Sequence, residues 1–278
     1  MKDHPFNPYH FAVEAILLIG TILALTRWSW ENFFVFFACW FLTFVVGMEV
    51  TLHRMLSHRS FSTPRWFERV LSVLSILSYQ GDPISWATHH RIHHAHSDTP
   101  KDPHNRSRGF WYAYLGWIFR PDPILYDQKL FRKYAPELAE DPFYKKLANP
   151  WIQRIIHFSF ALPLFLLGGI DYLLWGVFAR VFWSNHLTYM INSICHGTGY
   201  RNFETSDRSS NNIWIGYLTL GVGFHNNHHA QPNAINISHR AWEFDAAYLV
   251  IRIFEFLGVA NLQKKNNTCP RALAGENI

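Results

Sequence analysis

Four long apolar stretches, grouped in two pairs, dominate the pattern of hydrophobic and polar positions along the chain. Residues 11–27 and 32–52 are separated by only a short polar break, and residues 151–170 and 171–192 meet near Gly168. Each stretch approaches the ~20 apolar residues that a helix needs to cross the hydrocarbon core of a bilayer. The pattern therefore predicts four membrane spans arranged as two helical hairpins.

The distribution of positive charge gives these spans an orientation. The breaks inside the two hairpins hold only Arg27, whereas most Lys and Arg residues lie within residues 53–150 and 193–278. Because cytoplasmic loops are enriched in Lys and Arg, both termini and both of these segments are expected in the cytoplasm. We therefore predict one all-α integral membrane domain over residues 1–278, with a cytosolic helical cap, in a bacterial inner membrane or an equivalent one.

Composition agrees with this placement and limits the partners. Hydrophobic residues make up 49% of the chain and charged residues only 16%, which is unusual for a soluble protein. The net charge of +5 indicates contact with anionic lipid, and because no basic run is interleaved with a nucleic-acid motif, no nucleic-acid partner is expected.

Residues 66–79 and 242–259 have helical apolar spacing but are too short or too charged to span, so they are expected at the membrane surface or packed in the cap. Cys39, Cys195 and Cys269 are scattered and indicate reduced thiols.

Seventeen histidines stand out against this background, and most fall in residues 53–58, 89–96 and 225–229. Imidazole suits Zn, Cu, Fe and Ni, and a single zinc site needs only three or four ligands, so nine well-spaced histidines predict two ions. The chain has no HExxH helix and no serine, cysteine or carboxylate constellation, which argues against zinc proteolysis and acyl-enzyme chemistry. The isolated histidines are interpreted as hydrogen-bonding or interfacial residues: His4, His10, His157, His186 and His239.

The spacing within the clusters carries further predictions. Residues at i, i+3 and i+4 share one face of an α-helix, so His90, His93 and His94 are expected to converge, although spacing alone also allows His89 with His93 or His93 with His96. By the same rule the third cluster is expected to converge through His225, His228 and His229. Since His53 and His58 are five residues apart, about 140° around an α-helix, they predict a helix that serves two metal ions from adjacent faces.

The four motifs that carry this chemistry resemble those of a known family. The stretches "HRMLSHRSF", "HRIHHAHSDTPKDPHNRSRGFWYAYLGW", "NSICHGTGYR" and "GFHNNHH" are similar to the motifs of the membrane fatty acid desaturases, from about Gly47 to about Leu262. Within that family they resemble the acyl delta-9 branch, which includes stearoyl-CoA desaturase and its bacterial and cyanobacterial relatives. The resemblance implies a four-helix stem under a cytosolic cap that holds two iron ions, Fe2+ in the reduced state, and a bent channel for a saturated acyl chain.

The resemblance also implies a ligand set and a reaction. It selects the register His90, His93 and His94 in the second cluster and places Asn192 on the metals through a water molecule. The reaction it implies uses O2 and two external electrons, from ferredoxin or from a small cytochrome with its reductase, to introduce a cis double bond, expected at delta-9. The implied iron ligands are His53, His58, His90, His93, His94, His196, His225, His228 and His229.

Several alternatives stay open at this point. The substrate carrier could be a lipid or CoA; where the CoA-using branch has polar and charged residues before the second cluster, this chain has Gly81, Thr88 and His89, which weakens the case for CoA. A di-iron hydroxylase or an acetylene-forming relative would share the metal chemistry. A histidine-rich metal transporter is disfavoured, because it would place the clusters inside the spans.

Residues around the implied ligands form a second tier of predictions. Asp102, His104 and Arg108 are expected either to fix the cap through salt bridges or to orient ligands. Glu49 could be functional or a surface acid at the membrane edge. Val222 stands where many relatives have an acid, and Tyr189 stands where a Trp is usual. Four residues are assigned to the substrate channel, and the first two, about 18 and 12 Å below His53 along a regular helix, are expected to close its far end: Phe41, Val45, Trp86 and Tyr189.

Overall fold

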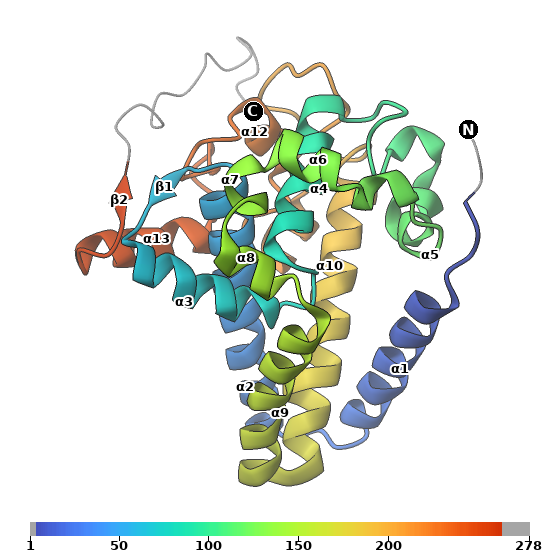
Figure 1. Cartoon of the computed structure of the whole chain (residues 1–278), viewed down its shortest axis with the longest axis vertical. Helices are drawn as coiled ribbons and strands as arrows, with labels where there is room; N and C mark the ends of the chain where they lie inside the picture. Colours follow the sequence, from blue (N-terminus) through green and yellow to red (C-terminus); the bar gives the residue numbers. More distant parts are fainter. Residues whose placement is uncertain (1–3, 263–278) are drawn as a thin grey trace.

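The computed structural model describes residues 4–262, in which regular structure is almost entirely helical (Figure 1). Long helices form a stem, and shorter helices form a cap at one end of it. The stem consists of α1 (Pro8–Leu25), α2 (Trp30–Trp40) with its continuation η1 (Phe41–Ser57), α9 (Pro150–Leu173), η5 (Leu174–Ala179) and α10 (Arg180–Ile194). Cys269 and the other residues after Leu262 lie outside the described part of the chain.

Three helical segments of the described chain are long and apolar enough to cross a membrane: Pro8–Leu25, Trp30–Ser57 and Pro150–Ile194. The third is interrupted at Gly168 and Gly169, where φ and ψ leave the helical region and the chain doubles back (Figure 1). At Gly169 φ is +61° and ψ is −146°, a conformation essentially restricted to glycine. This break is the one that the sequence places near Gly168.

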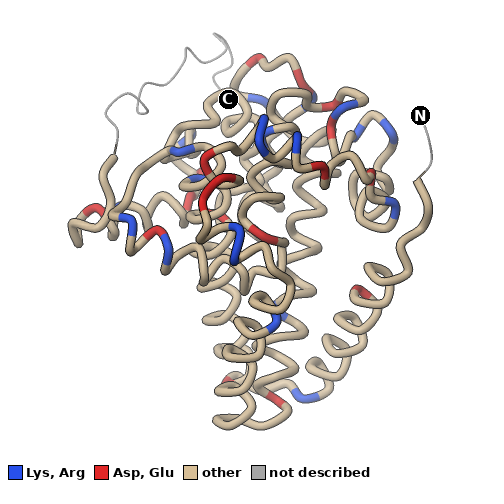
Figure 2. The backbone as a smooth tube through the Cα atoms, in the orientation of Figure 1, with Lys and Arg blue, Asp and Glu red and all other residues tan. Residues whose placement is uncertain are grey.

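The far end of the stem is joined by polar contacts between its two turns. Arg27 Nη1 lies 2.8 Å from Asp171 Oδ1, and Tyr172 donates to Glu31. Elsewhere the stem carries few charged residues, and most of the charged residues lie in the cap (Figure 2). Many outward side chains of the stem are large and apolar, including Leu166 and Leu167, as a surface in contact with lipid requires.

Helix η1 is wider than an α-helix and almost wholly buried. Its backbone hydrogen bonds join residues five apart in the sequence. A side-chain hydrogen bond has the same spacing, because Ser57 Oγ donates to the Leu52 carbonyl oxygen at 2.7 Å. The burial includes charge, because Arg54 Nη2 lies 2.9 Å from Asp245 Oδ1 with both side chains only 2% exposed. Such π-helical turns are rare and appear most often at functional sites.

The cap contains the segments that the sequence predicts as surface helices, and they lie across the stem as α3 (Arg65–Ile76) and α13 (Ala246–Phe256) (Figure 1). Trp66 and Val70 on α3, and Ile253 and Phe256 on α13, expose large apolar side chains. Strands β1 (Phe61–Ser62) and β2 (Asn261–Leu262) pair antiparallel and join the segments that flank these helices. The remaining cap elements are α4 (Pro83–His96), η2 (Arg106–Arg108), η3 (Tyr112–Gly116), α5 (Trp117–Phe119), η4 (Pro123–Tyr126), α6 (Gln128–Tyr134), α7 (Pro136–Ala139), α8 (Pro142–Leu147), α11 (Ile213–Leu218) and α12 (His225–Ala230).

Candidate metal centre

Nine histidines from four elements meet inside the cap and form two groups with the spacing of metal ligands. They come from the end of η1, from α4, from the turn after α10 and from α12. In each group the possible ligand atoms all lie within 4.8 Å of one another. We call His53, His58, His90, His94 and His228 the first histidine group, and His93, His196, His225 and His229 the second histidine group.

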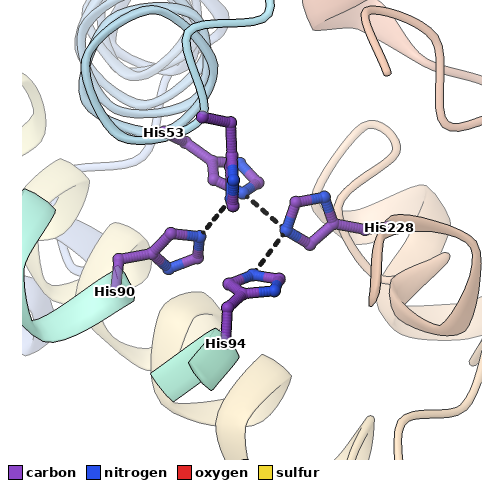
Figure 3. A group of neighbouring side chains, drawn as sticks. His53, His90, His94 and His228 are labelled. Atoms are coloured by element: carbon purple, nitrogen blue, oxygen red, sulfur yellow. Dashed lines mark hydrogen bonds between the residues drawn. The ribbon is translucent and has the colours of Figure 1, made fainter. Parts of the chain in front are cut away.

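The first histidine group directs its Nε2 atoms at a common centre. His228 Nε2 lies 2.9 Å from both His53 Nε2 and His94 Nε2, and His58 Nε2 lies 2.6 Å from His90 Nε2. Figure 3 shows four of these rings pointing toward one another. Five imidazoles that turn the same nitrogen inward with no other group between them make the arrangement that a cation requires.

The second histidine group repeats this arrangement on the other side of His228 and His94. His225 Nε2 lies 3.1 Å from His196 Nε2 and 3.0 Å from His229 Nε2, and His93 Nε2 lies 3.3 Å from His229 Nε2. The rings of His94 and His229, one from each group, stack with centroids 4.4 Å apart. The two groups are therefore neighbouring parts of one centre.

The histidines of each helical cluster converge on this centre, but each cluster divides between the two groups. On α4, His90 and His94 enter the first group and His93 enters the second. Residues four apart lie ~40° apart around an α-helix, whereas adjacent residues lie ~100° apart. An i, i+4 pair therefore serves one group and the residue beside it serves the other. Helix α12 does the same with the groups exchanged, because its i, i+4 pair lies in the second group and its intervening residue, His228, in the first.

His53 and His58 both belong to the first group, which corrects the prediction that they face two ions. The prediction assumed an α-helix. In the structure the His58 backbone N–H donates to the His53 carbonyl oxygen at 3.1 Å, a bond that spans five residues. Five residues make about one turn of this wider helix, so both side chains emerge on nearly the same side.

A layer of buried carboxylates lies directly outside the rings. Glu49 Oε2 accepts from His53 Nδ1 at 2.8 Å, and Asp102 Oδ1 accepts from His93 Nδ1 at 3.0 Å. Glu49 is 3% exposed, which excludes the surface-acid interpretation. Because the Nδ1 proton is held by the carboxylate, the Nε2 lone pair of the same ring is free for a metal ion.

Two carboxylates of this layer were missed by the sequence analysis. Asp98 Oδ2 accepts from His196 Nδ1 at 3.1 Å, and Asp207 Oδ2 accepts from His229 Nδ1 at 2.7 Å. Asp98 lies within the quoted second motif, two residues after His96, and that proximity could have identified it. Asp207 lies far along the chain from every histidine cluster, and no sequence signal marks it.

Burial keeps the ligand histidines in the form that binds metals. It lowers the pKa of His58, His90, His94, His225, His228 and His229 well below the ordinary value, and the charges of neighbouring imidazoles lower it further. Burial also raises the pKa of Asp102, but the adjacent His93 and His104 outweigh this effect and hold that pKa well below its usual range. At neutral pH these six imidazoles are therefore neutral and Asp102 is ionised. His93 differs from them, because burial lowers its pKa but the adjacent Asp102 raises that pKa above the ordinary value.

The remaining predicted residues surround the centre. His104 is buried, its ring centroid lies 4.2 Å from that of His93, and burial together with the His93 charge lowers its pKa to about 3. Asn192 is buried on α10, one turn before His196. Arg108 lies with its guanidinium carbon 3.6 Å from the centre of the Tyr112 ring, which makes it part of the cap structure.

His89 and His96 lie outside both groups. His89 Nε2 lies 2.9 Å from the Leu125 carbonyl oxygen, and His96 Nε2 lies 3.1 Å from the Tyr134 hydroxyl. The alternative registers of the second cluster are thereby excluded within the described structure.

A pocket of about 840 Å³ begins at the histidines. His53 and His90 of the first group and His93 and His225 of the second are among its lining residues. Trp86 and Tyr189, which the sequence analysis assigns to the substrate channel, line it as well. Its far walls come from α1, α9 and the segment after α3.

The assignment of Phe41 and Val45 to the end of this pocket is not supported by the structure. Neither residue lines it, and both pack in the hydrophobic core, whereas Met48 of the same helix does line it. The π-helical winding of η1 brings Met48, five residues before His53, close to the side of the helix from which His53 emerges. Val45, eight residues before His53, is buried in the hydrophobic core.

The family model described as fatty acid desaturase matches residues 28–252, which include both histidine groups. The chain belongs to the fatty acid desaturase family. Members of this family are oxidoreductases that act on fatty acyl chains, so the metal-transporter alternative is excluded.

Curated relatives give the same assignment. The chain is 38% identical to the sn-1 stearoyl-lipid 9-desaturase of Anabaena variabilis, over 88% of this chain and 89% of that protein. It is 34% identical to the sn-1 stearoyl-lipid 9-desaturase of Synechocystis, over 90% and 77% of the two chains. It is also 35% identical to an acyl-CoA C20 Delta5-desaturase of Anemone leveillei, over 93% and 82%. These desaturases therefore differ in the carrier of the acyl chain while sharing most of their length with this one.

Proposed function

We propose that this desaturase is an integral membrane di-iron enzyme that introduces a cis double bond, at delta-9, into a long-chain saturated acyl chain of a glycerolipid. The observation that carries the proposal is that the pocket is walled by ligand histidines of both groups. A methylene pair in this pocket would lie beside both metal positions at once. The two relatives from cyanobacteria support the position of the double bond and the lipid carrier by their names.

Iron is the metal proposed for the two histidine groups. Neutral imidazole is a suitable ligand for iron, and the nine inward-facing Nε2 atoms fit two ions. Bound iron would activate O2 for the oxidation of an unactivated C–H bond, a reaction that amino-acid side chains cannot carry out alone. The balanced reaction is R–CH2–CH2–R + O2 + 2 e− + 2 H+ → R–CH=CH–R + 2 H2O.

The protein's own contribution is to position groups. The carboxylates hold the Nδ1 protons and thereby fix the orientation of the rings. Trp86 stacks on His90 with ring centroids 4.8 Å apart, so a pocket wall and a ligand form one rigid unit. A fixed methylene pair beside a fixed metal pair is what makes the product regioselective.

The charges around the pocket favour an uncharged carrier over CoA. Glu14, Glu49 and Asp82 line the pocket, against Arg154 as the one Lys or Arg among its lining residues. A carrier with several phosphates would be repelled by this acidic lining, whereas a neutral glycerolipid would not.

We also propose the topology that the sequence predicts: one domain with four spans, 11–27, 32–52, 151–170 and 171–192, and a cytosolic cap of residues 53–150 and 193–278. The break at Gly168 and Gly169, inside α9, supports it, because it splits the longest apolar segment into two antiparallel helical parts. A cytosolic cap would give a soluble donor, ferredoxin or a small cytochrome with its reductase, access to the metal centre for the two electrons.

The test uses full-length protein in nanodiscs that contain stearoyl and palmitoyl glycerolipids, with reduced ferredoxin as the donor. The expected product is the delta-9 monounsaturated lipid, and the expected metal content is two iron ions per chain. A parallel assay with stearoyl-CoA is expected to yield much less product. A hydroxylated or acetylenic product would favour the di-iron hydroxylase or the acetylene-forming enzyme. Turnover of the CoA ester alone would contradict the proposed glycerolipid carrier.

A further inference from the structure

The carboxylates that hold the histidine rings are divided unequally between the two groups. In the second histidine group three of the four rings have one: Asp102 on His93, Asp98 on His196 and Asp207 on His229. In the first histidine group, one of the five rings has such an ion pair within residues 4–262, Glu49 on His53. Two metal positions with nearly the same imidazole ligands therefore lie in different electrostatic surroundings.

These carboxylates are shielded from water. Their side chains are 1% exposed for Asp102, 3% for Glu49, 8% for Asp98 and 11% for Asp207. Charges so placed are screened far less than surface charges, and each lies one imidazole ring away from the metal position. A dication in the second group would meet three negative charges at this range, and one in the first group would meet one.

The three carboxylates of the second group are also held in place before any metal arrives. Asp207 accepts from the Ser209 backbone N–H at 3.0 Å and from its hydroxyl at 2.6 Å, and Asp98 accepts from the Arg208 backbone N–H at 2.8 Å. Asp102 accepts from the Asp98 backbone N–H at 2.9 Å. A ligand set whose outer partners are already fixed loses little freedom on binding, which raises its affinity.

We propose that the two metal positions differ in affinity and fill in order, the second histidine group first and the first histidine group afterwards. Glu49 is then the positioning residue of the weaker position, because it fixes His53 and supplies the carboxylate of that group. This inference rests on the two-metal function proposed above. The fifth imidazole of the first group is neutral, so it compensates only in part for two missing negative charges.

The experiment is an anaerobic calorimetric titration of metal-free full-length protein with Fe2+, in which the heat of each addition is measured. Two binding steps of one equivalent each are expected. Asp207→Asn is expected to weaken the tighter step by about tenfold to a hundredfold, the usual cost of losing a carboxylate partner of a ligand histidine. Glu49→Gln, the matched change on the other group, is expected to weaken the looser step by a similar factor and to leave the tighter step unchanged.

Both variants keep the shape of the side chain, and size-exclusion elution with helical circular dichroism checks that they fold. His225→Ala and His58→Ala assign the steps, because each removes a ligand from one group only. Two equivalents that bind wild type with one affinity would overturn the ordering, and so would a Glu49→Gln protein in which the tighter step is the one weakened. Wild type that binds fewer than two equivalents would overturn the two-metal function together with the ordering, so the two failures are distinct.

Discussion

The backbone N–H of His58 donates to the carbonyl oxygen of His53 at 3.1 Å, and this five-residue hydrogen bond places both imidazoles in the first histidine group. In an α-helix the same two residues would diverge by about 140°. Through such wide turns a single buried helix contributes two histidines to the first histidine group and, five residues before His53, a pocket-lining residue, Met48.

Replacement of His58 by Ala is expected to abolish desaturation and to lower the iron content, because the first histidine group loses a ligand. His96→Ala is the matched control. His96 ends α4, lies outside both groups and contacts the Tyr134 hydroxyl. Iron analysis and product analysis of both variants check the assignment. Normal iron content in His58→Ala, or loss of iron in His96→Ala with the fold intact, would show that the assignment of metal ligands is wrong.

The pocket wall makes a prediction about chain length. Met48→Trp adds volume on the lining and is expected to shift the preferred substrate from stearoyl toward palmitoyl chains. Phe41→Ala, on the same helix but outside the lining, is expected to leave the preference unchanged. Competition between the two chains, read as product ratio by mass spectrometry, separates the cases. A shift with Phe41→Ala and none with Met48→Trp would place the end of the channel deeper than the structure has it.

The buried ion pair between Arg54 and Asp245 joins the ligand-bearing helix to α13. Asp245→Ala leaves the guanidinium without its charge partner and is expected to cost about 3–5 kcal/mol of stability. Arg252→Ala breaks an exposed pair with Glu255 on α13 and is expected to cost less than about 1 kcal/mol. Equilibrium unfolding in detergent measures both. Equal losses of unfolding free energy in the two variants would mean that the buried pair stabilises the protein no more than the exposed pair does.

Acid should destabilise the metal-free protein through its histidines. Burial lowers the folded-state pKa of six of the ligands below 6.5, so the unfolded chain binds more protons than the folded one as pH falls through 6.5. Stability is then fully present above that value and is lost below it, by up to about 1.4 kcal/mol per pH unit for each histidine that takes up a proton only on unfolding. Thermal unfolding of metal-free protein from pH 8 to pH 5 tests this. A melting temperature that stays constant or rises toward pH 5 would contradict it.

The sequence was sufficient for the features that depend on neighbouring residues. Apolar length located the helices and the break at Gly168, and clustering located eight of the nine histidines of the two groups. The ninth, His196, came from the family resemblance. The sequence was not sufficient for features that depend on backbone geometry or on long-range contacts. The wide turns of η1 are not encoded in a spacing rule, and for that reason the prediction that His53 and His58 face two ions was wrong. The assignment of Val45 to the pocket is not supported either, because the sequence does not show which face of the helix lines the pocket.

The carboxylate layer shows the second limit. Glu49 precedes His53 by one turn and was noticed from sequence, although its burial was not. Asp207 reaches His229 only because the loop before α11 folds back over the centre, held by hydrogen bonds to Ser209 and Thr205. Contacts of this kind depend on tertiary packing, and one sequence contains no periodic signal for them.

The central claim is that two irons in this centre oxidise an acyl chain held in the adjacent pocket. A single-turnover experiment tests it most directly: protein loaded with two Fe2+ per chain, in nanodiscs with stearoyl glycerolipid and without any electron donor, is exposed once to O2. Since two Fe2+ supply the two electrons of one turnover, the account predicts up to one delta-9 oleoyl chain per protein and none from protein that carries His58→Ala. Oxidation of the iron with no unsaturated lipid formed, or with a hydroxylated chain in its place, would contradict the account.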